Sequence, residues 1–184
     1  MRIFRISIVV CLFASTVVMG DSWRPVEVLG TSSNNGDYVA RVLPARTYWW
    51  QRKPLAIIYK NIDEEYVQQE SFNISASPAP AEIAISNNGY LYTFDRWGQL
   101  GGGDVVVAYS PLGKMIKKYK LEDLYTDDQI EKIFHTKSST HWRCTGYKPW
   151  FNIDLIVQDS IGGYFVFKEK QATFTYHNES KCGD

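Results

Sequence analysis

The chain has 184 residues, with 20 Lys and Arg against 20 Asp and Glu, so its formal net charge is zero. This balance argues against a nucleic-acid-binding protein, which needs a strong basic excess. Hydrophobic residues make up 45% of the chain and aromatic residues 15%, a composition too apolar for a disordered protein. The composition therefore predicts a folded protein with a sizeable core and no nucleic-acid partner.

The first twenty residues have the pattern of a secretory signal peptide. Two arginines precede an apolar run over residues 6–19, and small residues stand before an expected cleavage site after Gly20. The run is shorter than the roughly 20 apolar residues that a membrane span needs. We therefore expect a secreted or periplasmic protein with no membrane span after signal removal, in which residues 21–184 form a single β-rich domain.

Cys144 and Cys182 are the cysteines that remain after this cleavage. In an oxidising compartment, two such cysteines are expected to form a disulfide, which would stabilise the fold by about 4 kcal/mol in the chain-entropy model. The alternative is that Cys144 acts as a nucleophile with His141. The disulfide is favoured because an oxidised cysteine has no thiolate to offer.

Alternating apolar and polar residues, rich in β-branched and aromatic types, run through most of the remaining chain. Strands are expected over residues 38–43, 55–60, 64–69, 81–86, 90–95, 105–109, 115–120, 152–158, 164–168 and 172–177. Glycine-containing turns at Asn35-Gly36, Asn88-Gly89 and Gly162-Gly163 separate several of these strands. Consecutive strands should therefore pair antiparallel.

One short α-helix is expected over Asp127–Phe134. Thr126 and Gln129 have the spacing of a capping box, and an apolar stripe with helical spacing begins at Ile130.

The sequence contains an internal repeat. The string SSNNGDYVARV around Gly36 recurs as ISNNGYLYTFD around Gly89, and PLAIIY ending at Tyr59 recurs as DVVVAY ending at Tyr109. A degraded third unit begins at Asp154. Such units are typical of β-propeller blades, although closed propellers have about four to eight blades. We therefore predict an all-β fold of antiparallel hairpins in two or three blade-like sheets. They would form either an open sandwich or an incomplete propeller that another chain completes.

Four strings carry a resemblance to a known group of proteins. They are DSW at 21–23, SNNG, YTFDRWGQLGGGDVVVAYSPLGKMIKKYKLEDL at 92–124, and SSTHWR at 138–143. They resemble a group of uncharacterised secreted bacterial proteins with a signal peptide, a DSW-like start and a core similar to propeller blades. The match covers most of residues 21–143. It implies a secreted or periplasmic β-rich domain and carries no activity.

Asp95 and Asp104 flank a glycine-rich loop and are a candidate cation site. They are further apart in the sequence than the ligands of a calcium loop. The pattern favours a long hairpin loop around a packed Trp97, and the cation site is the alternative.

No catalytic residue and no cofactor is assigned from the sequence. The chain lacks the Gly-x-Ser-x-Gly nucleophile elbow. Its histidines, His135, His141 and His177, lack the spacing of known metal motifs.

Trp49, Trp50, Arg52 and Lys53 are the candidate binding residues. Adjacent residues of an extended segment point to opposite faces, so at least one of the two tryptophans should be exposed. Aromatic rings beside Arg and Lys suit a sugar, a partner protein or an anionic polymer. The alternative is that a tryptophan covers the open end of the sandwich.

These observations favour a secreted, non-catalytic binding or interaction module with an envelope protein or a polysaccharide as its partner. One alternative is a hydrolase-type envelope enzyme whose site is assembled from distant loops. The other is a structural envelope component that self-associates through its edge strands.

Overall fold

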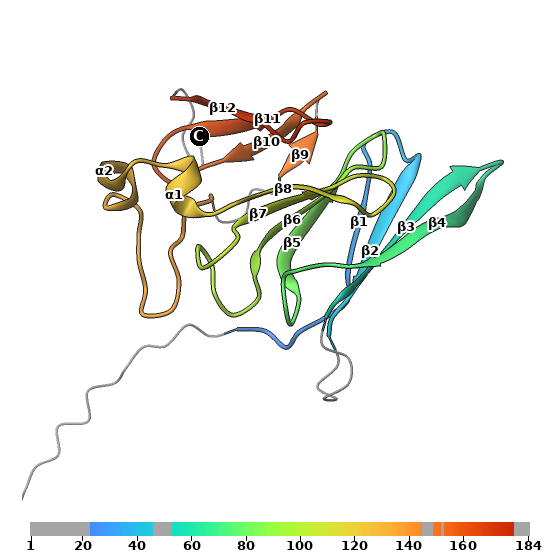
Figure 1. The fold of residues 1–184 in the computed structure, drawn as a ribbon, viewed down its shortest axis with the longest axis horizontal. Coiled ribbons are helices and arrows are strands. Elements are labelled where there is room, and N and C mark those ends of the chain that lie inside the picture. Colours follow the sequence, from blue (N-terminus) through green and yellow to red (C-terminus); the bar gives the residue numbers. More distant parts are fainter. Residues whose placement is uncertain (1–22, 46–52, 145–148, 152, 179–184) are drawn as a thin grey trace, which may run out of the picture.

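The computed structural model describes residues 23–45, 53–144, 149–151 and 153–178 (Figure 1). These residues form twelve strands and two short helices, and the strands make three four-stranded antiparallel sheets. Within the described residues, no helix has both the length and the apolar character needed to span a bilayer. The predicted all-β class and the antiparallel pairing of consecutive strands are confirmed.

The first sheet is a meander of β1 (Leu29–Ser32), β2 (Tyr38–Leu43), β3 (Leu55–Ile62) and β4 (Glu65–Asn73). The sequence analysis did not find β1. The last two strands form a hairpin that extends past the start of β2, because the first residue of β2 already pairs with Lys60. Figure 1 shows the tip of this hairpin projecting from the right-hand side of the molecule.

The second sheet contains β5 (Pro80–Ile85), β6 (Leu91–Arg96), β7 (Val106–Tyr109) and β8 (Met115–Tyr119). Every residue of β7 is buried, and β6 is buried up to its final arginine. Strands that are apolar on both faces need cover on both faces. This sheet is the middle layer of the molecule.

The third sheet contains β9 (Trp150–Phe151), β10 (Leu155–Gln158), β11 (Tyr164–Phe167) and β12 (Phe174–His177). It covers the face of the middle sheet that points away from the first sheet. The three sheets thus form an open sandwich of three layers (Figure 1).

Two one-turn helices, α1 (Leu121–Leu124) and α2 (Asp127–Ile130), connect the second and third sheets. The predicted helix start is confirmed, since Thr126 and Gln129 form a capping box. The predicted end at residue 134 is wrong. The chain leaves the helix after Ile130 and buries Ile133 but not Phe134, which is 67% exposed.

A related turn closes one hairpin in each sheet, and it is one residue longer in the first sheet than in the other two. It begins at Ser33, Ser86 and Asp159, and in each case the side-chain oxygen accepts the backbone N–H that re-enters the sheet, at 2.9, 3.0 and 2.6 Å. All three residues are buried. A glycine with positive φ, at +77°, +80° and +104°, completes each turn. The repeat read from the sequence therefore reflects three units that share one kind of turn.

Two separate apolar cores hold the layers together. The core between the first and second sheets includes Ala40, Val42, Ala56, Ile58, Ile83, Leu91, Val107 and Tyr109. The core between the second and third sheets is more aromatic and includes Tyr92, Phe94, Tyr119, Tyr125, Trp142, Phe165 and Phe167.

The third sheet is reversed relative to the other two. The shared turn aligns Phe165 and Phe167 of the third sheet with Tyr92 and Phe94 of the second. These equivalent residues face one another in a single core. The second and third sheets therefore meet through equivalent faces. Between the first and second sheets the faces are not equivalent, because Ala40, the match of Tyr92, faces Leu91 and its neighbours.

Four tyrosine hydroxyls donate hydrogen bonds in or beside the core between the second and third sheets. They are Tyr92 to the carbonyl of Glu169 at 3.1 Å, Tyr119 to the carbonyl of Ala172 at 2.7 Å, Tyr125 to the carbonyl of Trp142 at 3.2 Å, and Tyr176 to Asp159 Oδ2 at 2.7 Å. Burial is the largest cause that raises the pKa of each of these tyrosines above its usual value.

We expect the protein to lose stability as the pH rises above about 10, the pKa of an unfolded tyrosine. Above this pH the unfolded chain ionises these four tyrosines, whereas burial in the folded chain holds them neutral, so the unfolded state is favoured. Urea unfolding at pH 8 and pH 11 measures the change. Tyr119→Phe should reduce the loss, and Tyr66→Phe, at a residue 50% exposed, should not. Equal loss in both variants would contradict this explanation.

Candidate functional site

A buried ionic cluster lies at the end of β6. Asp95 is 2% exposed and adopts a positive φ of +51°. Its carboxylate accepts hydrogen bonds from Trp142 Nε1 at 2.7 Å, from the Gly101 N–H at 2.9 Å, and from Arg143 Nε and Nη2 at 3.2 and 3.1 Å. Asp95 is thus tied to its own loop and to the chain that leads into the third sheet.

Arg143 completes the cluster. Its Nη1 donates to Glu82 Oε2 at 2.7 Å, and its guanidinium lies 5.1 Å from the ring centre of Phe94 and 5.5 Å from that of Trp142. Burial acts to lower the pKa of Arg143, but the carboxylates of Asp95 and Glu82 outweigh it and raise the pKa. The guanidinium therefore stays charged within the fold.

The cluster fixes the glycine-rich loop that follows it. The N–H of Gly101 binds Asp95, and the carbonyl of Leu100 accepts the N–H of Thr140 at 2.9 Å. A Cβ atom at Gly101 would lie 2.6 Å from Thr140 Cβ, and its φ is +68°. Glycine is required here because the loop closes directly on the neighbouring segment.

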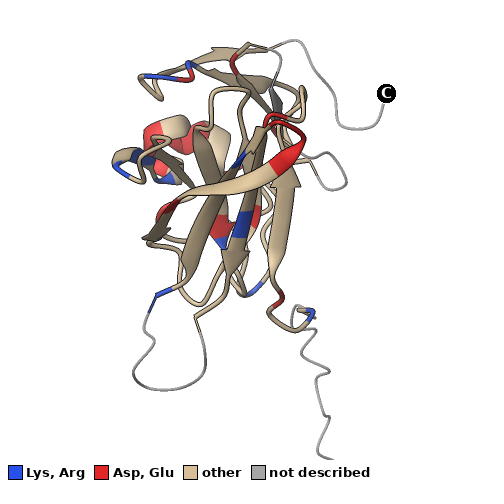
Figure 2. Ribbon diagram, turned by 90° about the vertical axis from the view of Figure 1, so that its right-hand side faces the viewer, with Lys and Arg blue, Asp and Glu red and all other residues tan. Residues whose placement is uncertain are grey.

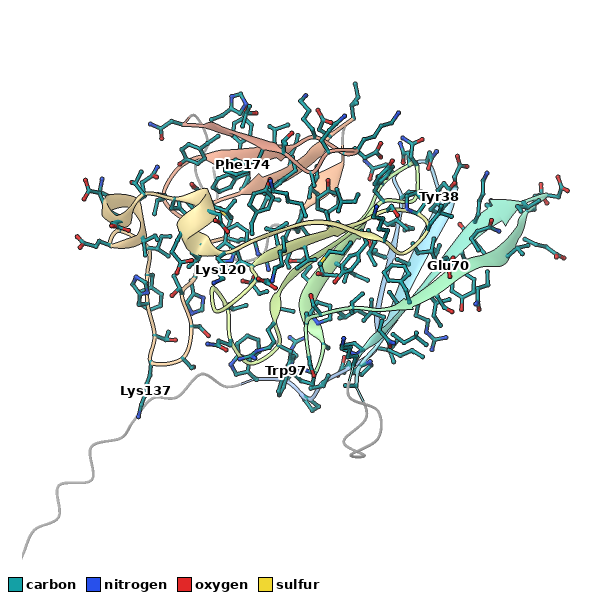
Figure 3. All side chains as sticks on the ribbon, viewed as in Figure 1. Tyr38, Glu70, Trp97, Lys120, Lys137 and Phe174 are labelled. Carbon is teal, nitrogen blue, oxygen red and sulfur yellow. The ribbon has the colours of Figure 1, made fainter. Side chains whose placement is uncertain are left out.

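Two adjoining hollows lie beside this loop, and Arg96 and Gln99 line both. The first, of about 260 Å³, also includes Ser75 and Asp104. The second, of about 450 Å³, is further lined by Ser77, Trp97, Lys137 and Ser138. Figure 3 shows Trp97 and Lys137 at the same edge of the molecule, on two different loops.

The second hollow is cationic. Arg96 donates to the side chain of Gln99, and neither Arg96 nor Lys137 forms an ion pair with any residue that the structure describes. On the side seen in Figure 2, basic and acidic residues are interspersed and form no single basic face. The positive charge at this hollow is therefore local.

The predicted binding residues Trp49, Trp50 and Arg52 lie outside the described residues, whereas Lys53 is described and exposed. The chain on each side of this segment is tied to the 74–78 stretch that borders the hollows. The N–H of residue 45 donates to the carbonyl of residue 78 at 2.7 Å, and the N–H of residue 74 donates to the carbonyl of residue 54 at 3.0 Å.

The contacts of Asp95 and Asp104 give no support to a cation site between them. Asp95 is committed to Arg143 and Trp142, and Asp104 pairs with Lys118 Nζ at 3.2 Å. Within the described ranges, no group of three or more His, Cys, Asp or Glu side chains is arranged to hold a metal ion.

Cys144 is buried, with its Sγ 2.7 Å from the carbonyl oxygen of Asp159. Cys182 lies outside the described residues. The disulfide between them stays a prediction.

Sequence reasoning missed Arg143, Glu82 and the hollow around Arg96. Glu82 and Arg143 are 61 positions apart, so no local motif joins them. The available signal was Glu82 itself, a charged residue within a strand whose neighbours are apolar. Such a residue needs a buried partner.

A scan against protein-family models and a search of curated proteins found no match to this chain. The site is therefore interpreted from its own geometry and chemistry.

Proposed function

We propose that this chain is a secreted or periplasmic binding module without catalytic activity, processed after Gly20, and that it binds an acidic polysaccharide of the cell envelope. The observation that carries the proposal is the second hollow. There, two cations without ion-pair partners among the described residues, Arg96 and Lys137, line one concavity together with Trp97, whose ring also packs on that of Trp23 at 5.8 Å between centroids.

The chemistry of the hollow suits an acidic sugar. The apolar face of a sugar ring can pack on an aromatic ring such as Trp97. Arg96 can bind a carboxylate with two parallel hydrogen bonds, and the amide of Gln99 can bind hydroxyl groups. A volume of about 450 Å³ lies in the usual range for small-ligand sites.

The carboxylates near the hollow favour binding over hydrolysis. Asp95 and Glu82 are paired with Arg143, and Asp104 is paired with Lys118. Glycoside hydrolysis needs two carboxyl groups that face the substrate, one of them protonated. Carboxylates held in ion pairs are poor candidates for that role.

Affinity electrophoresis in gels that contain polygalacturonate, a carboxylated polysaccharide, tests the proposal. The protein should be retarded by polygalacturonate and not by neutral dextran. The double variant Arg96→Ala/Lys137→Ala should bind at least about tenfold more weakly, because it loses charge-assisted hydrogen bonds.

The matched control is Lys114→Ala/Lys132→Ala, which removes two exposed cations outside the hollow. It should bind as the unchanged chain does. Equal weakening in both double variants would show unspecific attraction to a polyanion, and absence of retardation in both gels would also contradict the proposal.

A further inference from the structure

The outer face of the first sheet points away from the second sheet and carries a group of apolar side chains on β2 and β3, beside polar side chains such as Gln68 and Ser71 on β4. The side chains of this face alternate along each strand with the side chains that are buried in the core between the first and second sheets. They surround a hollow of about 430 Å³ lined by Val28, Gly30, Val39, Arg41, Tyr59 and Tyr66. Val28 and Tyr66 are 47% and 50% exposed. Large apolar residues gathered in this way commonly mark an interaction surface.

The internal repeat shows that this face has the composition of a covered one. Because Ser33 and Ser86 begin related turns, the first two sheets can be aligned residue by residue through their strand registers. Three residues of the outer face then match three of the second sheet, Val39 with Leu91, Ile57 with Val107, and Tyr59 with Tyr109.

In the second sheet the matching residues are fully covered. Leu91, Val107 and Tyr109 are 0%, 2% and 3% exposed, and the unit that covers them is the first sheet. The surface that fits this kind of face is therefore another four-stranded sheet of the same chain. Both faces of the middle sheet are already occupied, so a second copy must supply the cover.

Like faces already pack together elsewhere in this protein, since the second and third sheets meet through equivalent residues of their other face, which carries Tyr92 and Phe94 in the second sheet. A twofold pair of identical faces is also the commonest closed assembly. We propose that the protein forms a twofold dimer in which the outer face of the first sheet packs against the same face of a second copy.

The charges on the first sheet are complementary in such a pair. Arg41 is exposed on the outer face, opposite Gly30, which has no side chain. The tip of the β3–β4 hairpin carries three exposed acidic residues, Asp63, Glu64 and Glu65, none paired with a residue that the structure describes. The tip projects beyond its own sheet (Figure 1), where it can reach Arg41 of the second copy.

Gly30 provides a sharp test, because a Cβ atom there would meet nothing within 4 Å and its φ is not positive. Gly30→Lys should therefore leave each chain folded while it places a cation in the dimer interface. Light scattering of the full chain at about 100 µM should give twice the mass of one chain. Gly30→Lys should give the mass of one chain.

Two matched variants localise the contact. Gly30→Ala, which adds only a methyl group, should remain dimeric. Val166→Lys should also remain dimeric, because Val166 alternates with the buried Phe165 and Phe167 and so lies on the outward face of the third sheet. A monomeric unchanged chain would overturn the proposal, as would a dimer that Val166→Lys dissociates and Gly30→Lys does not.

If Gly30→Lys fails to fold, hydrogen exchange of the unchanged chain tests whether the first sheet forms the dimer interface. Dilution into the monomer range should speed exchange in β2 and β3 and leave the third sheet unchanged. Faster exchange in the third sheet alone would overturn the proposal. These measurements are independent of polysaccharide binding at Arg96.

Discussion

Asp95→Asn should lower the free energy of unfolding by about 3 kcal/mol, because it leaves a buried guanidinium with one carboxylate in place of two. Asparagine is nearly isosteric with aspartate and tolerates the positive φ of +51° at this position. The change removes the charge and also replaces one of the two acceptor oxygens with an NH2 group that faces N–H donors. Urea unfolding followed by tryptophan fluorescence measures the loss.

Asp104→Asn is the matched control. Asp104 also forms an ion pair, but its partner Lys118 is 54% exposed, and ion pairs on the surface contribute about 1 kcal/mol or less. A similar small loss for Asp95→Asn would show that the buried cluster does not stabilise the fold as we describe.

Asp159→Ala should also cost about 3 kcal/mol. Its Oδ1 accepts three backbone N–H groups, at 3.1, 2.9 and 2.6 Å, and its Oδ2 accepts the hydroxyl of Tyr176 at 2.7 Å. Buried donors left without an acceptor cost about 1–3 kcal/mol each. Thermal and urea unfolding of this variant give the loss.

The other units provide the control for this prediction. Asp159→Ser introduces the residue that begins the related turn in the first two sheets, at Ser33 and Ser86. It should recover about half of the lost stability, since the serine oxygen can accept the N–H of Gly163 but cannot reach Tyr176. If serine is no better than alanine, the three turns are not equivalent.

The layout of the units could be predicted because turn chemistry is local. A polar residue followed by a glycine with positive φ marks each shared turn within a few residues. β1 escaped prediction because Leu29–Ser32 is short, includes a glycine and has a single apolar residue, so its sequence shows no alternation of apolar and polar residues. The helix was predicted too long because the apolar stripe after Ile130 does not distinguish the buried Ile133 from the exposed Phe134.

The stacking of the sheets and the candidate site could not be predicted in this way. Alternation shows that a strand has an apolar face but not which sheet covers it, so the reversal of the third sheet leaves no mark in the sequence. The buried cluster joins Asp95 to Arg143 across 48 positions, and the hollow at Arg96 takes Lys137 from a separate loop. Such contacts are set by tertiary packing alone.

The order of the layers has a consequence for the growing chain. The middle sheet is synthesised well before the sheet that covers its second face, so Tyr92 and Phe94 emerge long before Phe165 and Phe167. Until then an aromatic sheet surface has no cover, and exposed apolar strands are prone to aggregate. We therefore expect a chaperone that binds the exposed face of the middle sheet, until the third sheet has been synthesised, to reduce aggregation of this chain.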